Sequence, residues 1–391
     1  MYPQSFEKEC VLRKQKIVSS LTNGEDAILV SDNANLFYTS GRVFSGYTYI
    51  TTSGEELFFV KRPVGLMGEN VIYIRKPEQI LEELEKRGIA QPKTLALELN
   101  SLSYNDVLRL QKAFNGVALS NGSAIMQSVR ACKTDYEIAL LRQSGVLHAE
   151  SYAAIPELYT DGMTDATLQI EIERKMRQLG NLGQFRIAGQ SMEIFMGNLI
   201  CGDNADNPTP YDFAMGGAGL DSSLPVGCNG TRIEPGMTVM VDLGGNFNGY
   251  MTDMTRVFTL GDVDELAKKC HDCSIEICNH IKAIGRPGVE AKFLYEEAVR
   301  IATEAGLQDY FMGYTQKAGF IGHGVGIEIN ELPVLAPRSK HVLQEGNVIA
   351  VEPKFVIPHV GAAGVENTYV VTANSMEQIT NAPMEMLPLK A

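Results

Sequence analysis

The stretch "TVMVDLGGNFNGYMTDMTRVF", residues 238–258, decides how this chain folds. Its first apolar run ends at Asp242, and Asp253 lies eleven residues further on, inside a second β-rich run. Aspartate is a poor strand residue, and an ionised carboxylate is costly to bury without a partner. The glycines of the intervening "GGNFNG" allow the chain to fold back on itself. We therefore expect two neighbouring strands that place Asp253 beside Asp242.

This segment has an echo near the end of the chain. "EPGMTVMVD" (234–242) and "QEGNVIAVE" (344–352) match position for position: a turn, a glycine, an apolar run and a final carboxylate. A second acid follows each copy, Asp253 after the first and Glu366 after the second. Two half-domains related by a pseudo-twofold axis would bring these four carboxylates together at their centre. Chance similarity is the alternative, because turn-plus-strand units are common and a short match is weak support for a repeat.

Four converging carboxylates repel one another, and two divalent metal ions would neutralise them. On this interpretation Asp242 and Asp253 are metal ligands held on strands. The alternative is that one aspartate caps a turn and the other faces solvent. His323 lies between glycines in "GFIGHGVGIEINELP" (319–333), and a neutral imidazole is a common ligand of transition metals. A core histidine that serves only as a hydrogen-bonding group is the alternative for His323.

The order and context of these residues resemble a known family. "VDLGGNFNGYMTDMTRVF" resembles the DxG…GYxxDxTR stretch of the pita-bread metallopeptidases, and "GHGVGIE" resembles their GHGxGxE stretch. "AVEP" and "GVENTYVVT" resemble their IEP and IEDTxxVT stretches. The family includes the methionine aminopeptidases, aminopeptidase P, prolidase and creatinase. The resemblance covers about residues 130 to 391, and the first 125 residues resemble the N-terminal domain of the prolidase and aminopeptidase P branch.

The resemblance implies a dinuclear metallohydrolase, with a Xaa-Pro dipeptidase or aminopeptidase P-like activity as the first hypothesis. Asp242 would hold one metal ion, Asp253 and Glu366 would bridge both ions, and His323 and Glu352 would complete the second site. Glu352 would also shuttle protons. The two ions would share a bridging water and activate it as the nucleophile. One nitrogen among oxygen ligands suits Mn²⁺, our first candidate, or Co²⁺, Zn²⁺ or Fe²⁺.

The expected substrate contacts depart from the family pattern. Val226 and Asn330 stand where the family usually has histidines, and Gly364 stands where it usually has an arginine. We expect Asn330 to take a catalytic role as a hydrogen-bond donor to substrate, and Val226 to line the substrate site without donating. Loss of one oxyanion donor typically costs about 10²–10³ in rate. His359 lies near Glu366 in sequence and is a further candidate substrate contact, with a surface position as the alternative.

These departures leave two other functions open. One is hydrolysis of a non-peptide C–N bond in a small molecule, since Val226 and Asn330 change the groups that would meet a peptide. The other is a non-catalytic binding module, which the retention of all five ligands disfavours. For a hydrolase the expected substrate is a small peptide or an amino-acid-derived molecule.

The length of 391 residues suggests two domains, and the alternation of strand and helix signals predicts an α/β chain. The resemblance implies that these domains are a creatinase-like α/β domain over 1–125 and a pita-bread α+β domain over 130–391. We expect a hairpin over 47–62 around Ser53 and Gly54, and helices over 77–88, 103–114, 133–155 and 162–180, the third of them after a cap at Thr134 and Asp135. We also expect a helix over 263–284 that carries "CHDCSIEICNH" (270–280). That stretch invites a zinc site, but no second ligand pair follows at finger spacing. Buried cysteines with exposed histidines on one helix are the alternative that we prefer.

Composition and charge exclude several partners. The net charge is −13 without a basic block, so we expect no nucleic acid partner. We expect no membrane association, because no apolar run reaches the roughly 18 residues that a span requires. Seven cysteines and an N-terminus without an apolar leader indicate free thiols and a cytoplasmic protein. The two-domain relatives imply a homodimer.

Overall fold

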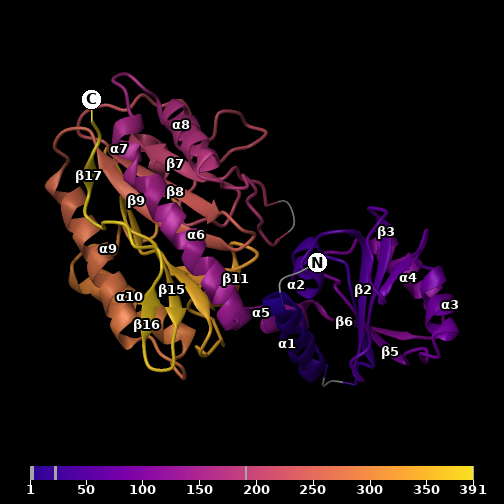
Figure 1. Ribbon diagram of the computed structural model, residues 1–391. Coiled ribbons are helices and arrows are strands. Elements are labelled where there is room, and N and C mark those ends of the chain that lie inside the picture. The colour runs from indigo at the N-terminus through magenta and orange to yellow at the C-terminus, as the bar shows by residue number, and fades with distance from the viewer. Residues whose placement is uncertain (1–3, 22–23, 190–191, 391) are drawn as a thin grey trace. The chain divides into compact units, whose positions relative to one another are not determined.

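The computed structural model describes residues 4–21, 24–189 and 192–390 of the chain. It divides into two compact units, Met1–Arg130 and Ala131–Ala391, each with its own sheets and helices (Figure 1). Helix α5 (Ser123–Ala131) covers the stretch in which the sequence predicts the boundary between domains.

The first unit is built on one mixed sheet with the strand order β4-β3-β2-β1-β5-β6. The strands are β1 (Ala27–Val30), β2 (Ser45–Thr51), β3 (Glu56–Arg62), β4 (Val71–Tyr73), β5 (Thr94–Leu97) and β6 (Ala118–Asn121). β1 pairs antiparallel with β2 and parallel with β5. The predicted hairpin around Ser53 and Gly54 is confirmed as the antiparallel β2–β3 pair.

Helices surround this sheet. They are α1 (Gln4–Ser20), α2 (Asn33–Ser40), α3 (Gln79–Lys86), α4 (Tyr104–Ala113) and α5. Our sequence analysis anticipated α3 and α4 from their caps and periodicity, but it did not predict α1, α2 or α5. Helix α2 begins where the Asp32 side chain accepts a hydrogen bond from the Ala34 amide and ends at Gly41, whose φ of 71° is left-handed. Its interior, NANLFYTS, is rich in Asn, Thr and Ser, which have low helix propensity, whereas the Glu- and Leu-rich α3 of the same length has strong helix formers.

The second unit contains two larger sheets and a hairpin. The first sheet has the order β17-β9-β8-β7, the second β11-β10-β12-β15-β16, and β13 pairs with β14. The strands are β7 (Gly197–Cys201), β8 (Thr238–Asn246), β9 (Met251–Thr259), β10 (Gly322–Gly324), β11 (Glu331–Leu335), β12 (Val348–Val351), β13 (Lys354–Ile357), β14 (Gly361–Gly364), β15 (Asn367–Val371), β16 (Met376–Gln378) and β17 (Leu387–Pro388).

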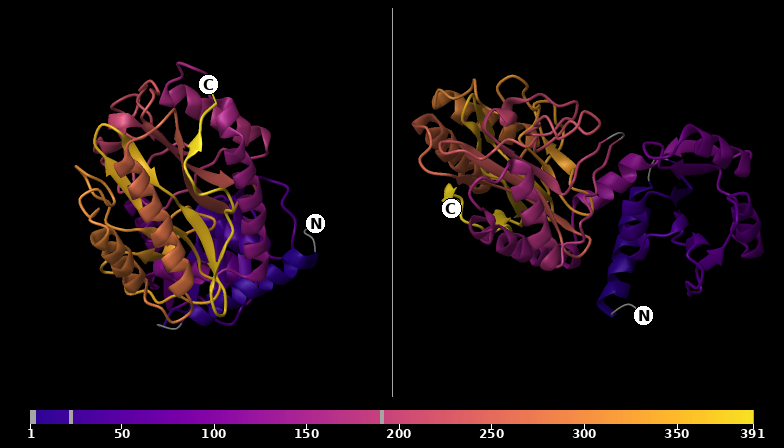
Figure 2. Two further views of the ribbon diagram at one scale, coloured as in Figure 1. Left: turned by 90° about the vertical axis from the view of Figure 1, so that its left-hand side faces the viewer. Right: turned by 90° about the horizontal axis from the view of Figure 1, so that it is seen from above.

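Two groups of helices flank these sheets (Figure 2). They are α6 (Asp135–Ala153), α7 (Ile155–Leu158), α8 (Asp165–Gln178), α9 (Glu265–Ile284) and α10 (Ala291–Glu304), with a 3₁₀ turn, η1 (Gly202–Asp206). α6 packs on β8 and β9, whereas α9 packs on β13 and β14. The predicted cap of α6 is confirmed as a capping box between Thr134 and Glu137.

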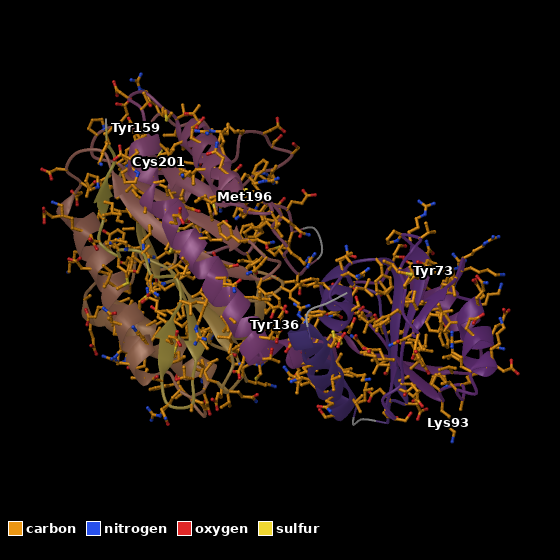
Figure 3. All side chains as sticks on the ribbon, in the orientation of Figure 1. Tyr73, Lys93, Tyr136, Tyr159, Met196 and Cys201 are labelled. Carbon is orange, nitrogen blue, oxygen red and sulfur yellow. The ribbon has the colours of Figure 1, made fainter. Side chains whose placement is uncertain are left out.

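Apolar side chains fill the space between helices and sheets. Tyr159, Met196 and Cys201 belong to the core cluster that joins β7, β8 and β9 to α6 and α8 (Figure 3). A second cluster lies under α9 and α10 and includes Cys270, Cys273 and Cys278. Within the described ranges no helix is both long and apolar enough to cross a membrane.

The stretch 270–280 lies on α9, as predicted, but one expectation about it is wrong. We expected exposed histidines, and His271 is only 2% exposed. Its Nε2 lies 2.7 Å from the Met384 carbonyl oxygen, and its Nδ1 accepts a hydrogen bond from the Gly364 amide. His271 therefore joins α9 to the segments around it instead of facing solvent.

Candidate metal centre

The β8–β9 hairpin places the first two acids. Gly244 pairs with Asp253 and Asp242 pairs with Thr255, so the two aspartates lie close together on adjacent strands. Gly197 on β7 runs so close to β8 that an added Cβ would meet the Asp242 carbonyl oxygen at 2.2 Å. Only glycine allows this approach, and the backbone around Asp242 is held on both sides.

The second copy of the echo places the other two acids in an equivalent way. Val351, the last residue of β12, pairs with Asn367, the first residue of β15, so Glu352 and Glu366 lie opposite each other beyond the strand ends. The β13–β14 hairpin fills the interval between them in sequence. The expected pairing of carboxylates is therefore present in both halves of the unit.

Reciprocal hydrogen bonds join β9 to β15 at the centre. The Thr255 hydroxyl donates to Glu366 Oε2 at 2.8 Å, and the Thr368 hydroxyl donates to the Asp253 carbonyl oxygen at 2.8 Å. Each threonine lies two residues after an acid of the cluster, although Thr255 donates to a carboxylate and Thr368 to a backbone carbonyl. These contacts join the two halves of the unit at the carboxylates.

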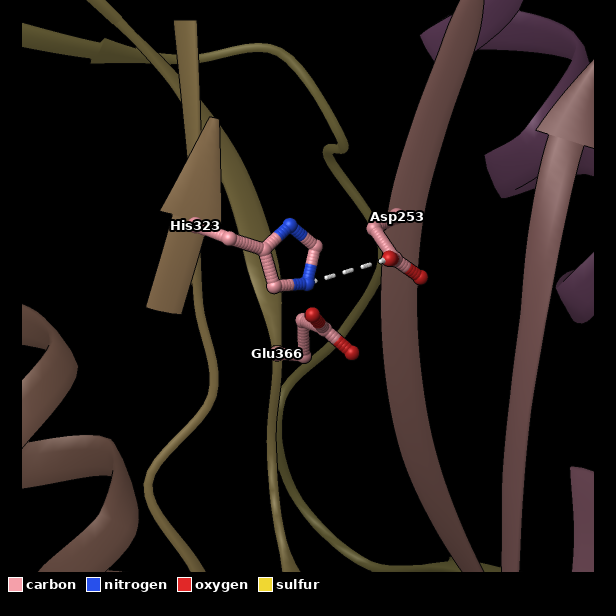
Figure 4. A group of neighbouring side chains, drawn as sticks. All are labelled: Asp253, His323 and Glu366. Carbon is pink, nitrogen blue, oxygen red and sulfur yellow. Dashed lines mark ion pairs between the residues drawn. The ribbon is translucent and has the colours of Figure 1, made fainter. Parts of the chain in front are cut away.

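His323 completes one group of donors with Asp253 and Glu366 (Figure 4). Its Nε2 lies 3.8 Å from Asp253 Oδ2 and 3.3 Å from Glu352 Oε1. Its Nδ1 lies 3.1 Å from the Gly324 carbonyl oxygen, which favours the tautomer with a proton on Nδ1. The neutral ring then presents a lone pair on Nε2, as a metal ligand must.

The electrostatics of the cluster show unbalanced negative charge. Burial, followed by repulsion from Asp242, raises the pKa of Asp253 to about 7. Burial and the nearby Asp253 and Glu352 charges also raise the pKa of Glu366 well above its usual value. Burial lowers the pKa of His323, but its contacts with Glu352 and Asp253 outweigh burial and raise it to about 9. Carboxylates that must hold protons near neutral pH are typical of a site made for cations.

The group of Asp253, His323 and Glu366 fits a divalent ion on three counts. Its donor atoms lie within 4.8 Å of one another, and they offer two oxygens and one nitrogen. Glu366 Oε1 is also buried without a hydrogen-bond partner. A buried carboxylate oxygen without a partner is costly, and a bound cation would remove that cost.

A second group of donors consists of Asp242, Glu352 and Glu366, and a lysine lies in it. Lys354 Nζ donates to Asp242 Oδ2 at 2.8 Å, to Glu352 Oε2 at 2.7 Å and to Glu366 Oε2 at 3.3 Å. Burial by itself lowers the pKa of Lys354, but the three carboxylates outweigh it and raise the pKa well above its usual value. Burial raises the pKa of Glu352, but Lys354 and His323 together bring it down to about 2.

Our sequence analysis did not predict a role for Lys354. A signal was present, because Lys354 follows Glu352 by two residues in an extended segment, where alternate side chains point to the same face. A basic residue on the same face as an expected metal ligand indicates that its ammonium group could compete with a metal ion for the carboxylates.

An apolar pocket opens onto the carboxylates. Its lining includes Asp242, Asp253, His323, Glu352 and Glu366. Its walls include the apolar side chains Phe185, Ile187, Met192, Ile194, Phe213, Phe320 and Ile329, together with Asn198, Asp212 and Asn330. No lysine or arginine is among the described residues that line it. The described lining is therefore apolar and acidic.

The structure places the other predicted substrate contacts differently. Asn330 lines the pocket, but its side chain both accepts from the Ala188 amide at 2.7 Å and donates to the Ala188 carbonyl at 2.8 Å. Val226 is 2% exposed and is not among the described residues that line the pocket.

His359, the third predicted substrate contact, lies at the surface. Its side chain is 88% exposed and pairs with Asp203 at 3.2 Å, outside the pocket lining. The residue adopts a left-handed turn with φ of 66°, which directs the chain from β13 into β14. Gly364 has φ of 135°, so the position where the family pattern has an arginine is strained for any other L residue here.

Comparison with known proteins supports the family that the sequence motifs resemble. Residues 139–373 match metallopeptidase family M24, and residues 14–132 match the Creatinase/Prolidase N-terminal domain. The Xaa-Pro dipeptidase of Pyrococcus horikoshii is 27% identical over 372 residues, which cover 93% of this chain and 95% of that protein. The Xaa-Pro dipeptidase of Pyrococcus furiosus is 27% identical over 383 residues, which cover 96% of this chain and 99% of that protein.

The fold is also that of a solved relative. The crystal structure of the prolidase from Pyrococcus horikoshii OT3 matches with a TM-score of 0.77 at 25% identity, covering 96% of this chain and 100% of that chain. The resemblance and the two-part fold expected from the sequence are thereby confirmed. This protein belongs to metallopeptidase family M24, with a creatinase/prolidase-type domain ahead of the metallopeptidase domain.

Proposed function

We propose that this protein is a metal-dependent hydrolase of short peptides, with Xaa-Pro dipeptides as the first substrate class. The observation that carries the proposal is the group of Asp253, His323 and Glu366 on the wall of an apolar pocket. The Xaa-Pro dipeptidases that resemble this chain along nearly its whole length support the choice of substrate.

The residues of the pocket have separable roles in such a reaction. A divalent ion held by Asp253, His323 and Glu366 would polarise a carbonyl group and lower the pKa of water. Glu352, whose Oε1 lies 3.3 Å from His323 Nε2 beside this group, would accept the proton of an attacking water and return it to the leaving amine. The aromatic walls at Phe185 and Phe320 exclude solvent from the carboxylates.

The identity and number of the metal ions are part of the proposal. The resemblance implies two ions per chain, and the five predicted ligands would be sufficient for both if no other group occupied the cluster. Mn²⁺ is the first candidate because oxygen donors predominate, and Co²⁺, Zn²⁺ and Fe²⁺ are the alternatives. The requirement for a metal and the number of ions can be measured independently.

Turnover of Xaa-Pro dipeptides by protein loaded with Mn²⁺ tests the proposed activity. We expect proline release that a chelator abolishes and that added Mn²⁺ restores. Asp253→Asn should be inactive, whereas Asp203→Asn, which changes an exposed acid outside the pocket, should behave like the wild type. If no proline were released with any of the four candidate metals, the proposed activity would be excluded.

A second function is favoured by the lining of the pocket. A free dipeptide carries a carboxylate, and no described residue of the lining offers a lysine or arginine to bind it. Hydrolysis of a small C–N bond in a neutral or cationic molecule fits this surface better. N-acyl amino acid amides and amidines should then be hydrolysed faster than Xaa-Pro dipeptides under the same conditions, and the reverse order would reject this alternative.

The oligomeric state and the cellular location are two further proposals. A homodimer follows from the resemblance to two-domain relatives, and sedimentation of the purified protein tests it: a single monomeric species would contradict it. A cytoplasmic location follows from the seven free cysteines. Recovery of the protein in an oxidising compartment with disulfides would contradict that location.

A further inference from the structure

We propose that the ammonium group of Lys354 is a built-in cation that takes the place of one of the two metal ions, so that this centre holds a single divalent ion at Asp253, His323 and Glu366. The inference rests on the metal site of the proposed function but not on the substrate. It changes the expected chemistry of the centre from a pair of metal ions to one metal ion and one ammonium group.

The contacts of Lys354 coincide with the second group of donors. Nζ lies 2.7–3.3 Å from one oxygen of each of Asp242, Glu352 and Glu366, the same three acids that could hold a second ion. The side chain of Lys354 is 0% exposed. Three carboxylate partners satisfy all three N–H groups of an ammonium. Within the described part of the chain the lysine is therefore fully paired by this group alone.

Glu366 divides its two oxygens between the two positions. Oε2 accepts from Lys354 Nζ and from the Thr255 hydroxyl, at 3.3 and 2.8 Å. Oε1 is buried and has no hydrogen-bond partner among the residues that the structure describes. Glu352 shows the same division, with Oε2 on Lys354 at 2.7 Å and Oε1 facing His323 Nε2 at 3.3 Å. One oxygen of each acid is thus committed to the lysine, and the other remains for the histidine side of the cluster.

A divalent ion and the ammonium group cannot use the second group of donors together. Both need the lone pairs of the same carboxylate oxygens, and two cations at that separation repel each other strongly in a buried site. An ion could enter only if Lys354 left the cluster. The side chain starts inside the β13–β14 hairpin, where Lys354 pairs with Gly364, and it is buried along its length. Displacing it would leave a cation to be accommodated elsewhere in the core.

The number of bound ions tests the inference directly. We expect about one Mn²⁺ per chain in the wild type and about two in Lys354→Met, which vacates the position while keeping a side chain of similar length. Lys133→Met is the matched control, because Lys133 is also buried and paired, with Glu331 at 3.0 Å, but lies outside the cluster. It should bind the same number of ions as the wild type. Elemental analysis and calorimetric titration with Mn²⁺ both give the ratio.

A gain of an ion separates this role from a structural one, since damage to the fold would lower metal content instead of raising it. Lys354→Met removes the cation that pairs with three acids and should need Mn²⁺ to fold, so the wild type supplies a second measurement. Its electron paramagnetic resonance spectrum with excess Mn²⁺ should be that of an isolated ion, without exchange coupling. Two ions per chain in the wild type, or a coupled spectrum, would overturn the inference.

The experiments distinguish a failure of this inference from a failure of the proposed function. A wild type with one ion and no peptidase activity would leave the lysine assignment standing and remove the substrate assignment. A wild type that cleaves Xaa-Pro dipeptides with a coupled pair of ions would do the opposite.

Discussion

At the scale of single residues, the acids of the centre carry more negative charge than the protein itself neutralises. Asp253 and Glu366 have raised pKa values, and Glu366 Oε1 has no partner. These residues therefore lower the stability of the folded protein without metal, and a bound cation should raise it. Stability measured with and without metal is the property that reports on them.

We predict that Glu366→Gln and Asp253→Asn each abolish most of the rise in melting temperature that Mn²⁺ produces. In the wild type, an ion present at 100 times its dissociation constant should stabilise the fold by about 2.7 kcal/mol. Without metal, Asp253→Asn should be at least as stable as the wild type, because it removes an acid that burial and repulsion from Asp242 disfavour in its charged form. Thermal melts with and without Mn²⁺ check this, with Asp203→Asn as the control. A full metal-induced shift in Asp253→Asn would disprove its role as a ligand.

His148 supplies a second prediction at this scale, on the dependence of stability on pH. The residue is completely buried, its Nδ1 lies 3.0 Å from the Thr252 hydroxyl, and its Nε2 has no partner. Burial lowers its pKa from 6.5 to about 3. The unfolded chain therefore takes up the proton first as the pH falls. The contribution of neutral His148 to the free energy of unfolding is therefore fully present above pH 6.5. It is lost progressively as the pH falls toward about 3.

Urea unfolding at a series of pH values measures this effect. Below pH 6.5 the loss due to His148 should be about 1.4 kcal/mol per pH unit. His148→Gln, which can still bond to Thr252, should reduce the acid slope by about one proton. Identical slopes for the two proteins would show that His148 does not titrate in this way.

At the scale of elements, the segment before β7 is held over the pocket by the residues that precede β11. The Ile329 amide donates to the Arg186 carbonyl at 2.8 Å, and Asn330 makes both of its bonds to Ala188. Phe185 and Ile187, which line the pocket, belong to this segment. Asn330 therefore lines the pocket and also holds one of its wall segments in place through Ala188.

We predict that Asn330→Ala leaves the metal content unchanged and reduces kcat/KM. Two hydrogen bonds of about 0.5–1.5 kcal/mol each are lost, and the segment around Ala188 should exchange its amide hydrogens faster. Hydrogen exchange and metal analysis check the two parts. Asn330→Asp is the matched control, since it keeps the acceptor for the Ala188 amide. If Ala188 exchanged at the wild-type rate in Asn330→Ala, this positioning role would be excluded.

At the scale of the whole molecule, the chain consists of two compact units, and every proposed ligand belongs to residues 131–391. Ligand binding stabilises the part of a protein that must be folded to bind it. Any effect of metal on residues 1–130 would have to be transmitted from the other unit.

We predict that Mn²⁺ protects the second unit selectively. Amide hydrogens of β8, β9, β12 and β15 should exchange more slowly with Mn²⁺, whereas those of β1 and β5 in the first unit should not change. Hydrogen exchange followed by mass spectrometry resolves the two units within one sample. Equal protection of both would show that the units unfold as one cooperative block.

Many elements of this fold could be predicted from local sequence. Apolar periodicity and cap residues were enough to identify α6, α8, α9 and the β2–β3 hairpin, because neighbouring residues decide such features. Helix α2 was missed because the Asn, Thr and Ser in its interior have low helix propensity, although α3, of the same length, was recognised. The echo of 234–242 and 344–352 predicted paired carboxylates, and the pairing of β8 with β9 and of β12 with β15 provides it.

The sequence by itself determined the kind of fold, the two halves and the acids that converge at their centre, because repeated motifs carry that information in local order. Only the tertiary structure decided how those acids are shared. Lys354 and Asp242 are 112 residues apart in sequence, yet their side chains lie 2.8 Å apart, and no local pattern predicts that contact. His359 is seven residues from Glu366 and is nevertheless exposed. Burial and long-range pairing depend on how separate strands pack, so distance along the chain could not show which charges meet.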